Sequence, residues 1–148
     1  MRIALKIFTL CVSLVIAGCS TDRATKEAIR RAETIAREMP DSALVLIESV
    51  DPHNVRGEDD KAHYRLVEAE VLYYNRILPD REEVAQPLFD HYLTSNDHRG
   101  RARAMYQYAL VMQAEGENAE ALYALLEAEK SLEFCYFLFF RFIEMFIF

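Results

Sequence analysis

The chain has 148 residues, a formal net charge of −7 at pH 7 and 52% hydrophobic residues, with only four glycines and four prolines. The acidic balance excludes the class of nucleic-acid-binding proteins that depend on a basic face, because these proteins displace counterions from phosphates with Lys and Arg. The scarcity of Gly and Pro, beside abundant Ala, Leu and Glu, favours helices throughout. The composition therefore predicts an acidic, all-α protein of one domain.

The N-terminal segment, residues 1–18, has the architecture of a signal peptide. Arg2 and Lys6 supply positive charge at its start, and an apolar run of 11 residues follows at 7–17. A membrane-spanning helix needs about 20 apolar residues, so this run is too short to be one. The segment therefore predicts export rather than a spanning anchor.

The pair Gly18-Cys19 ends the apolar run in the way that is typical of a lipoprotein signal peptide. We expect cleavage between these two residues and acylation of Cys19, with residues 19–23 as the anchor and a short linker. Cleavage removes two positive charges and no negative one, which takes the formal charge from −7 to −9. Ser20 gives no inner-membrane retention signal of the Asp type, so the outer membrane is favoured. An ordinary secretory peptide that leaves Cys19 as a free thiol, or a retained N-terminal helix, is the alternative.

The residues after the linker carry an apolar period close to 3.6, which predicts six helices in three pairs. Pro40 and Pro79 separate elements, since the residue before a proline avoids the helical conformation. Asp80 and Glu83 are spaced like a capping box at the start of the fourth helix, whereas Pro87 predicts a kink or a delayed start within it. We expect the helices near residues 24–38, 41–50, 59–78, 81–94, 99–115 and 118–133.

The last helix pair has a pattern of small and apolar residues that resembles a tetratricopeptide repeat, a helix-turn-helix unit whose small residues allow close helix approach. The residues that carry the resemblance are Ala109, Met112, Gly116, Ala121, Leu125 and Ala128. Parts of this spacing recur in the earlier pairs, at Ala69 and Leu72 and at Ala43, Ile47 and Val50.

The resemblance covers residues 24–133 and implies a solenoid of about three helix pairs, as in tetratricopeptide-repeat lipoproteins of Bacteroides-type bacteria. A generic helical bundle is the alternative, since alanine at helical spacing is frequent in any packed helix. The chain departs from the family at Glu133, which replaces the closing proline. It also departs in the 40 residues from Ala69 to Ala109, because the usual repeat is about 34 residues long.

In such repeats the first helix of each pair lines a concave face on which a protein or peptide binds. If Ala109 and Met112 face the core, the helical period turns eight other side chains toward this face. The predicted partner-binding residues are His63, Leu66, Glu70, Tyr73, Arg103, Tyr106, Leu110 and Gln113. Carboxylate-clamp members of the family place Lys and Asn on these faces, so the presence of Glu70 and Leu110 argues against that subtype.

The residue types give no sign of a catalytic or metal-binding constellation. The four histidines lack the i, i+4 pair with an intervening Glu that holds zinc on one helix face, and no Ser or Cys lies in a glycine elbow. We therefore expect no enzyme activity, no cofactor and no metal. Arg99, Arg101 and Arg103 could bind a phosphate or carboxylates, but pairing with Asp97 or with acidic neighbours on adjacent helices is the favoured interpretation.

The C-terminal tail, residues 134–148, holds seven of the nine Phe residues and resembles nothing upstream. As a helix it would be about 22 Å long, which is short of a hydrocarbon core of about 30 Å. Arg141 and Glu144 also interrupt it. Three interpretations stay open: an interrupted reading frame that truncates a longer signalling or assembly protein, an interfacial helix that supplements the lipid anchor, and burial against a partner chain.

Taken together, these patterns predict a lipid-anchored protein of the cell envelope that acts as a protein-protein interaction scaffold. The expected partners are a protein or peptide on the concave face and the membrane through acylated Cys19, with no nucleic acid. The alternative function is that of a small-ligand or glycan-uptake accessory lipoprotein. Such a protein needs aromatic stacking surfaces, and this chain has no Trp. The oligomeric state stays open.

Overall fold

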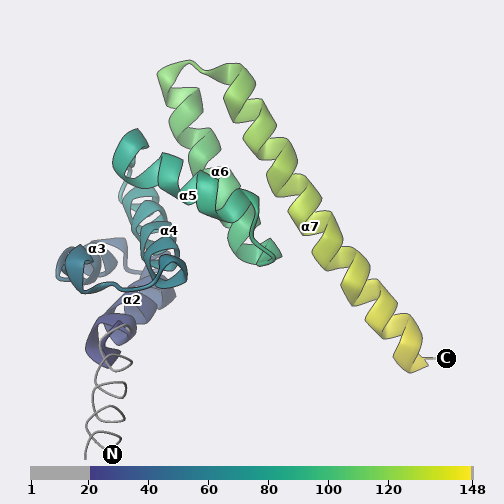
Figure 1. The fold of residues 1–148 in the computed structure, drawn as a ribbon, viewed down its shortest axis with the longest axis horizontal. Coiled ribbons are helices and arrows are strands. Elements are labelled where there is room, and N and C mark those ends of the chain that lie inside the picture. The colour runs from purple at the N-terminus through teal and green to yellow at the C-terminus, as the bar shows by residue number, and fades with distance from the viewer. Residues whose placement is uncertain (1–20, 148) are drawn as a thin grey trace, which may run out of the picture.

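A computed structural model describes the backbone of residues 21–147 and the side chains of residues 21–133. The predicted cleavage site at Gly18 and Cys19 lies outside the described residues. The described chain forms helices and turns without any strand, so the all-α prediction is confirmed for this part. The α-helices are α2 (Arg23–Ile35), α3 (Pro40–Glu48), α4 (Glu58–Tyr74), α5 (Gln86–Leu93), α6 (His98–Glu115) and α7 (Asn118–Ile147). A 3-10 turn, η1 (Pro52–Asn54), and a π-helical turn, η2 (Arg81–Ala85), complete the fold (Figure 1).

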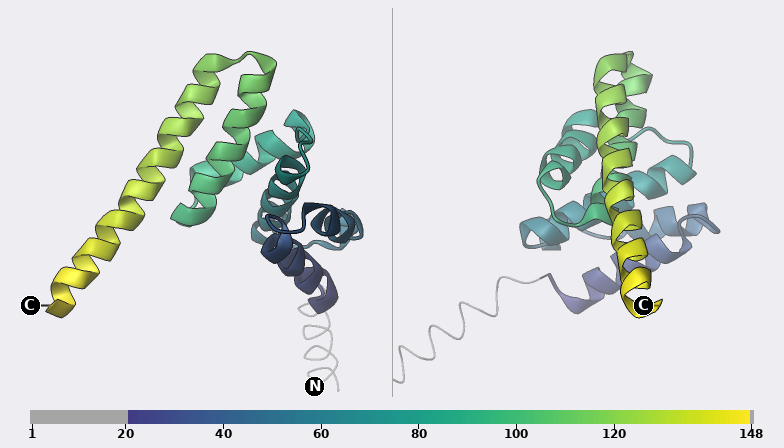
Figure 2. Two further views of the ribbon diagram at one scale, coloured as in Figure 1. Left: turned by 180° about the vertical axis from the view of Figure 1, so that it is seen from behind. Right: turned by 90° about the vertical axis from the view of Figure 1, so that its right-hand side faces the viewer.

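The helices follow one another as three hairpins, α2 with α3, α4 with η2 and α5, and α6 with α7 (Figure 1). Each later hairpin packs its first helix on the hairpin before it: α4 contacts both α2 and α3, and α6 contacts both α4 and α5. Helix α7 is much longer than α6, and its C-terminal part extends past the start of α6 in both views of Figure 2.

Small residues lie where the helices approach most closely. Ala109, Ala121 and Ala124 are buried in the cluster that joins α6 to α7, and Ala32 and Ala43 are buried between α2 and α3. An alanine at such a contact lets two helix backbones come close without a gap, because dense packing needs side chains whose volume matches the space. The larger core side chains Leu66, Leu88, Met105 and Met112 fill the space between hairpins.

Two glycines are required by the local geometry of α6. A Cβ atom on Gly100 would lie 2.4 Å from the ring of Tyr92 and 2.4 Å from the carboxylate of Asp97, which caps the helix by accepting a hydrogen bond from the Gly100 backbone N–H. Gly116 ends α6 with a φ of 86°, a left-handed conformation that favours glycine. The tight turn at Gly116 brings α7 back along α6.

Several helix boundaries differ from the sequence prediction, and the end of α4 has an identifiable reason. Helix α4 ends at Tyr74 rather than near residue 78, and the Asn75 side chain donates to the carbonyls of Val71, at 2.8 Å, and of Pro40, at 3.0 Å. The last helix, expected to end near residue 133, continues to Ile147. Within residues 21–147 no helix combines the length and the hydropathy that crossing a membrane requires.

Pro87 delays the start of α5, as its position predicts. The chain first makes the π-helical turn η2, in which the Ala85 N–H donates to the carbonyl of Asp80 at 3.0 Å. The Asp80 side chain caps this turn by accepting from the Glu83 N–H at 2.8 Å. The α-helix then begins with Pro87 in its first turn, where the missing backbone donor has no intrahelical partner to lose.

Candidate partner-binding face

The first helices of the three hairpins, α2, α4 and α6, are neighbours in space, because α4 contacts both of the others. Their outward side chains form the surface that we call the α2-α4-α6 face. Seven of the eight predicted partner-binding residues lie at least partly open on α4 and α6: His63, Glu70, Tyr73, Arg103, Tyr106, Leu110 and Gln113. The exception is Leu66.

The prediction that Leu66 is a partner-binding residue was wrong, because its side chain is only 1% exposed. Leu66 lies three positions before Ala69, so the two share one side of α4, and both belong to the core cluster that includes Ala104 and Met105 of α6. The helical period alone shows only that Leu66 lies next to the face. The side chain is buried because the following hairpin, α6 with α7, packs over it.

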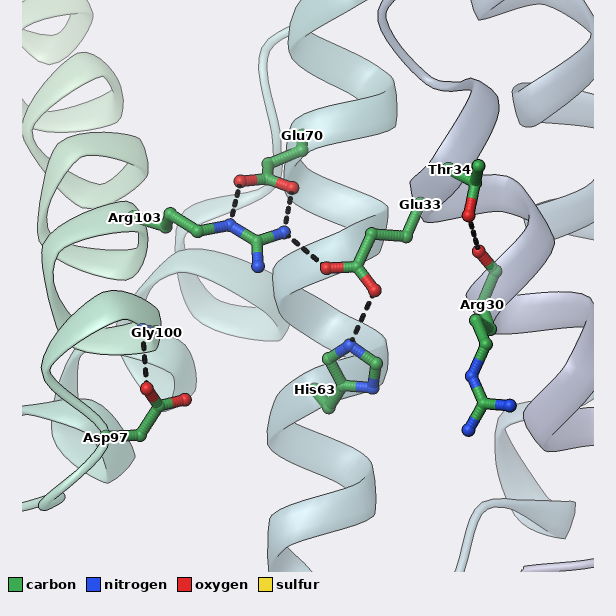
Figure 3. Close-up of polar contacts among 8 residues, drawn as sticks. All are labelled: Arg30, Glu33, Thr34, His63, Glu70, Asp97, Gly100 and Arg103. Atoms are coloured by element: carbon green, nitrogen blue, oxygen red, sulfur yellow. Dashed lines mark hydrogen bonds and ion pairs between the residues drawn. The ribbon is translucent and has the colours of Figure 1, made fainter.

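Arg103 is the centre of a polar network that joins all three helices (Figure 3). Its guanidinium binds Glu70 of α4 in a bidentate manner, with Nε 2.7 Å from Oε1 and Nη2 2.5 Å from Oε2. The same Nη2 donates to Glu33 Oε1 of α2 at 2.8 Å, and the other oxygen of Glu33 lies 3.1 Å from His63 Nε2. A planar guanidinium is suited to this geometry, since its N–H groups match the two oxygens of a carboxylate.

The network shifts the pKa values of its members. Burial by itself raises the pKa of Glu33, but the hydrogen bond and positive charge of Arg103, together with His63, outweigh burial and hold the pKa below its ordinary value. The hydrogen bond that Arg103 donates to Glu70 is the largest cause that raises the pKa of Arg103, so its guanidinium stays charged. With two carboxylates on one guanidinium, Arg103 is already occupied and is not a free site for an acidic ligand.

Replacing Glu33 with glutamine is expected to lower the free energy of unfolding at pH 7 by about 1 kcal/mol, because Arg103 loses a charged partner at a half-buried position. The folded-state pKa of Glu33 is depressed, so its contribution is present above the unfolded pKa of about 4.3 and is lost as pH falls through the folded value. Urea titrations of both proteins at pH 7 and pH 3 measure this. The control is Glu27→Gln on the exposed side of α2, and a Glu33 effect equal at both pH values would contradict the assignment.

A group of tyrosines lies beside this network on the α2-α4-α6 face. Tyr73 of α4 and Tyr106 of α6 are each 41% exposed, and their rings meet edge to face with centroids 6.2 Å apart and an interplanar angle of 82°. Tyr74 adds a third ring, 5.4 Å from that of Tyr73. A hydrogen bond with Tyr73, followed by burial, raises the pKa of Tyr106. Two successive hairpins therefore contribute to one exposed aromatic surface.

The basic cluster expected near the start of α6 is largely paired, as the favoured interpretation holds. Arg101 donates to the carbonyl of Leu93 at 2.5 Å and approaches Glu127 of α7 at 4.0 Å, while Arg103 is held by Glu70 and Glu33. These two side chains therefore stabilise contacts between helices.

Glu33 and Tyr74 are residues of this face that the sequence prediction missed. The sequence pattern did not show which side of α2 faces outward, and Tyr74 directly follows a residue that was assigned to the face.

The side chains of residues 21–133 include no group of three or more His, Cys, Asp or Glu residues placed to hold a metal ion. Comparisons of the chain with protein-family models, with curated proteins and with solved structures gave no match.

Proposed function

We propose that this chain is a lipid-anchored protein-interaction module of the bacterial cell envelope, in which tetratricopeptide-like hairpins present the α2-α4-α6 face to a partner protein. The proposal is supported by the chain of hairpins, each stacked on the one before, by the left-handed turn at Gly116, and by the burial of Ala109, Ala121 and Ala128. The anchor is acylated Cys19, which stands two residues before the described chain begins and four before α2.

The observation that carries the proposal is the edge-to-face pair formed by Tyr73 and Tyr106. Tyrosine is enriched at protein interfaces because its ring offers a large apolar area and its hydroxyl a hydrogen bond. Here two rings from different hairpins stand open, and Tyr106 shares one groove wall with Leu110 and Gln113, which add an apolar and an amide contact. A peptide or helix laid across α4 and α6 would touch both rings.

The electrostatics of the face favour recognition by shape and aromatic contact. Since Arg103 is bound by Glu70 and Glu33, a partner's carboxylate would have to displace an existing ion pair to reach it. We therefore propose a partner segment that carries apolar and amide or hydroxyl groups at the contact. This agrees with the expectation that the chain is not a carboxylate clamp.

Capture from cell-envelope extract tests the proposal. The full chain, expressed with its signal segment, is cross-linked in membranes, and captured proteins are quantified by mass spectrometry for the wild type, Tyr73→Ala and Tyr106→Ala. We expect one or a few proteins to be depleted at least about tenfold in both tyrosine variants, as for a central aromatic contact. Val45→Ala, at an exposed apolar position on α3, is the matched control and should capture as the wild type does.

Two outcomes would overturn the proposal. One is a set of captured proteins that does not change in either tyrosine variant. The other is a mature N-terminus, read in the same preparation, that begins upstream of Cys19 or carries no acyl group, because the anchor would then be absent.

A further inference from the structure

A groove lies between α6 and α7 on the side of the last hairpin that no other described helix covers. Its volume is about 310 Å³, and it is lined by apolar side chains in the middle and amide side chains at the turn. The residues that matter for the argument are Tyr106 and Leu110 of α6, Leu122 and Leu125 of α7, and Gln113 and Asn118 near the turn. Leu122 and Leu125 are both exposed.

The two earlier hairpins have a corresponding groove, and in each the next helix of the chain fills it. In the first hairpin Ile47, which has the spacing of Leu125 in the sequence pattern, is 2% exposed and packs in one cluster with Tyr64, Val67 and Val71 of α4. In the second hairpin the ring of Phe89 packs against Tyr108 of α6, with centroids 4.3 Å apart. Leu125 itself is 43% exposed.

The first helices of the hairpins show the same contrast. Leu66 of α4 stands 40 positions before Tyr106 of α6, which is the distance between the corresponding alanines Ala69 and Ala109. Leu66 is buried by α6, whereas Tyr106 is 41% exposed. The groove between α6 and α7 therefore has the apolar walls of a helix-binding surface without the helix.

We propose that this groove binds one amphipathic helix of a partner protein, seated as α6 is seated on the hairpin before it. The proposal rests on the proposed function and specifies the partner's chemistry. The helices that fill the equivalent grooves insert apolar side chains of mixed size, Tyr64, Val67 and Val71 in α4 and Ala104, Met105 and Tyr108 in α6. We expect the partner helix likewise to insert apolar side chains of mixed size, with aromatic ones among them.

Charge defines a second property of the partner helix. Glu129 lies four positions after Leu125, and Glu133 four positions further, so both carboxylates continue the stripe of α7 that walls the groove. Both are exposed, and neither makes an ion pair with a side chain among residues 21–133. Since acidic rims favour basic partners, the flank of the bound helix that faces them should carry Lys or Arg.

The test uses two synthetic 18-residue helical peptides and the full chain. Both peptides carry Val, Met and Tyr on one face; the first has Lys along one flank, and the second has Glu at the same positions. Fluorescence anisotropy should show that the Lys peptide binds more tightly than the Glu peptide and that added salt weakens its binding. Leu122→Glu and Leu125→Glu should each weaken binding of the Lys peptide by about tenfold or more, and Glu129→Lys with Glu133→Lys should remove its advantage over the Glu peptide.

Val45→Glu is the matched control, since it also places a carboxylate at an exposed apolar position, but on α3, away from the groove. The two proposals can fail separately: if capture from envelope extract does not depend on Tyr73 but the Lys peptide still loses affinity in Leu122→Glu, the proposed function fails and the helix-binding groove stands. Equal binding of the Lys peptide by the wild type and both leucine variants, or no binding at all, would overturn the helix-binding groove. So would a wild-type dimer in light scattering that Leu122→Glu converts to a monomer, because a second copy would then occupy the groove.

Discussion

Replacing Leu66 with alanine is expected to lower the free energy of unfolding by about 2–5 kcal/mol. The side chain is fully buried where α4 meets α6, among Ala104 and Met105, and loss of three carbons there leaves a cavity that close-packed helices cannot fill. Urea denaturation followed by circular dichroism at 222 nm measures the change. The transition midpoint should fall while its steepness stays the same.

The matched control is Leu110→Ala, since the sequence pattern assigned both leucines to the partner-binding face. Leu110 lies on the wall of the groove between α6 and α7 and is only partly buried, so its loss should cost less than about 1 kcal/mol. Leu110→Ala should instead weaken partner binding. Equal losses of stability in the two variants would mean that α6 does not pack on α4 as described.

Replacing Ala124 with leucine is expected to destabilise the chain by about 1–3 kcal/mol, because the position has no room for a larger side chain. Ala124 is fully buried in the cluster that joins α7 to α6, together with Ala109 and Ala121. Three added carbons force the two helices apart or the new side chain out of its preferred rotamer. Thermal unfolding should show a lower Tm for this variant.

Ala119→Leu provides the control on the same helix, because Ala119 is exposed and leucine is nearly as good a helix former as alanine. Its Tm should stay within about 2 °C of the wild-type value, because we expect the free energy of unfolding to change by only about a few tenths of a kcal/mol. An Ala124→Leu variant as stable as Ala119→Leu would show that α6 and α7 do not approach closely at this alanine.

Most of the helix pattern could be predicted from the sequence because the signals are local. Pro40 lies in the first turn of α3, Pro87 in the first turn of α5, and Asp80 caps the turn before it, each as its own backbone chemistry dictates. The early end of α4 was not predictable in this way. Asn75 bonds the carbonyl of Pro40 as well as that of Val71, and a contact between residues 35 positions apart leaves no local trace.

The residues exposed on the α2-α4-α6 face were predicted in part, and the error at Leu66 follows from the same limit. A helical period fixes which residues share a side of α4, yet Leu66 stands at the edge of that side, and only the position of α6 decides whether it is covered. Glu33 was missed because its contact is also a long-range one. Nothing near it in the sequence shows that Arg103, 70 positions away, will bind it.

The 70 positions between Glu33 and Arg103 bear on the order in which the parts of the chain fold. Each hairpin closes over a short loop, such as the turn at Gly116, and can form early because the entropy lost in joining its ends is small. The bond from Arg103 to Glu33 closes a loop of 70 residues and needs all three hairpins in place. It therefore forms late in folding, after the hairpins have stacked.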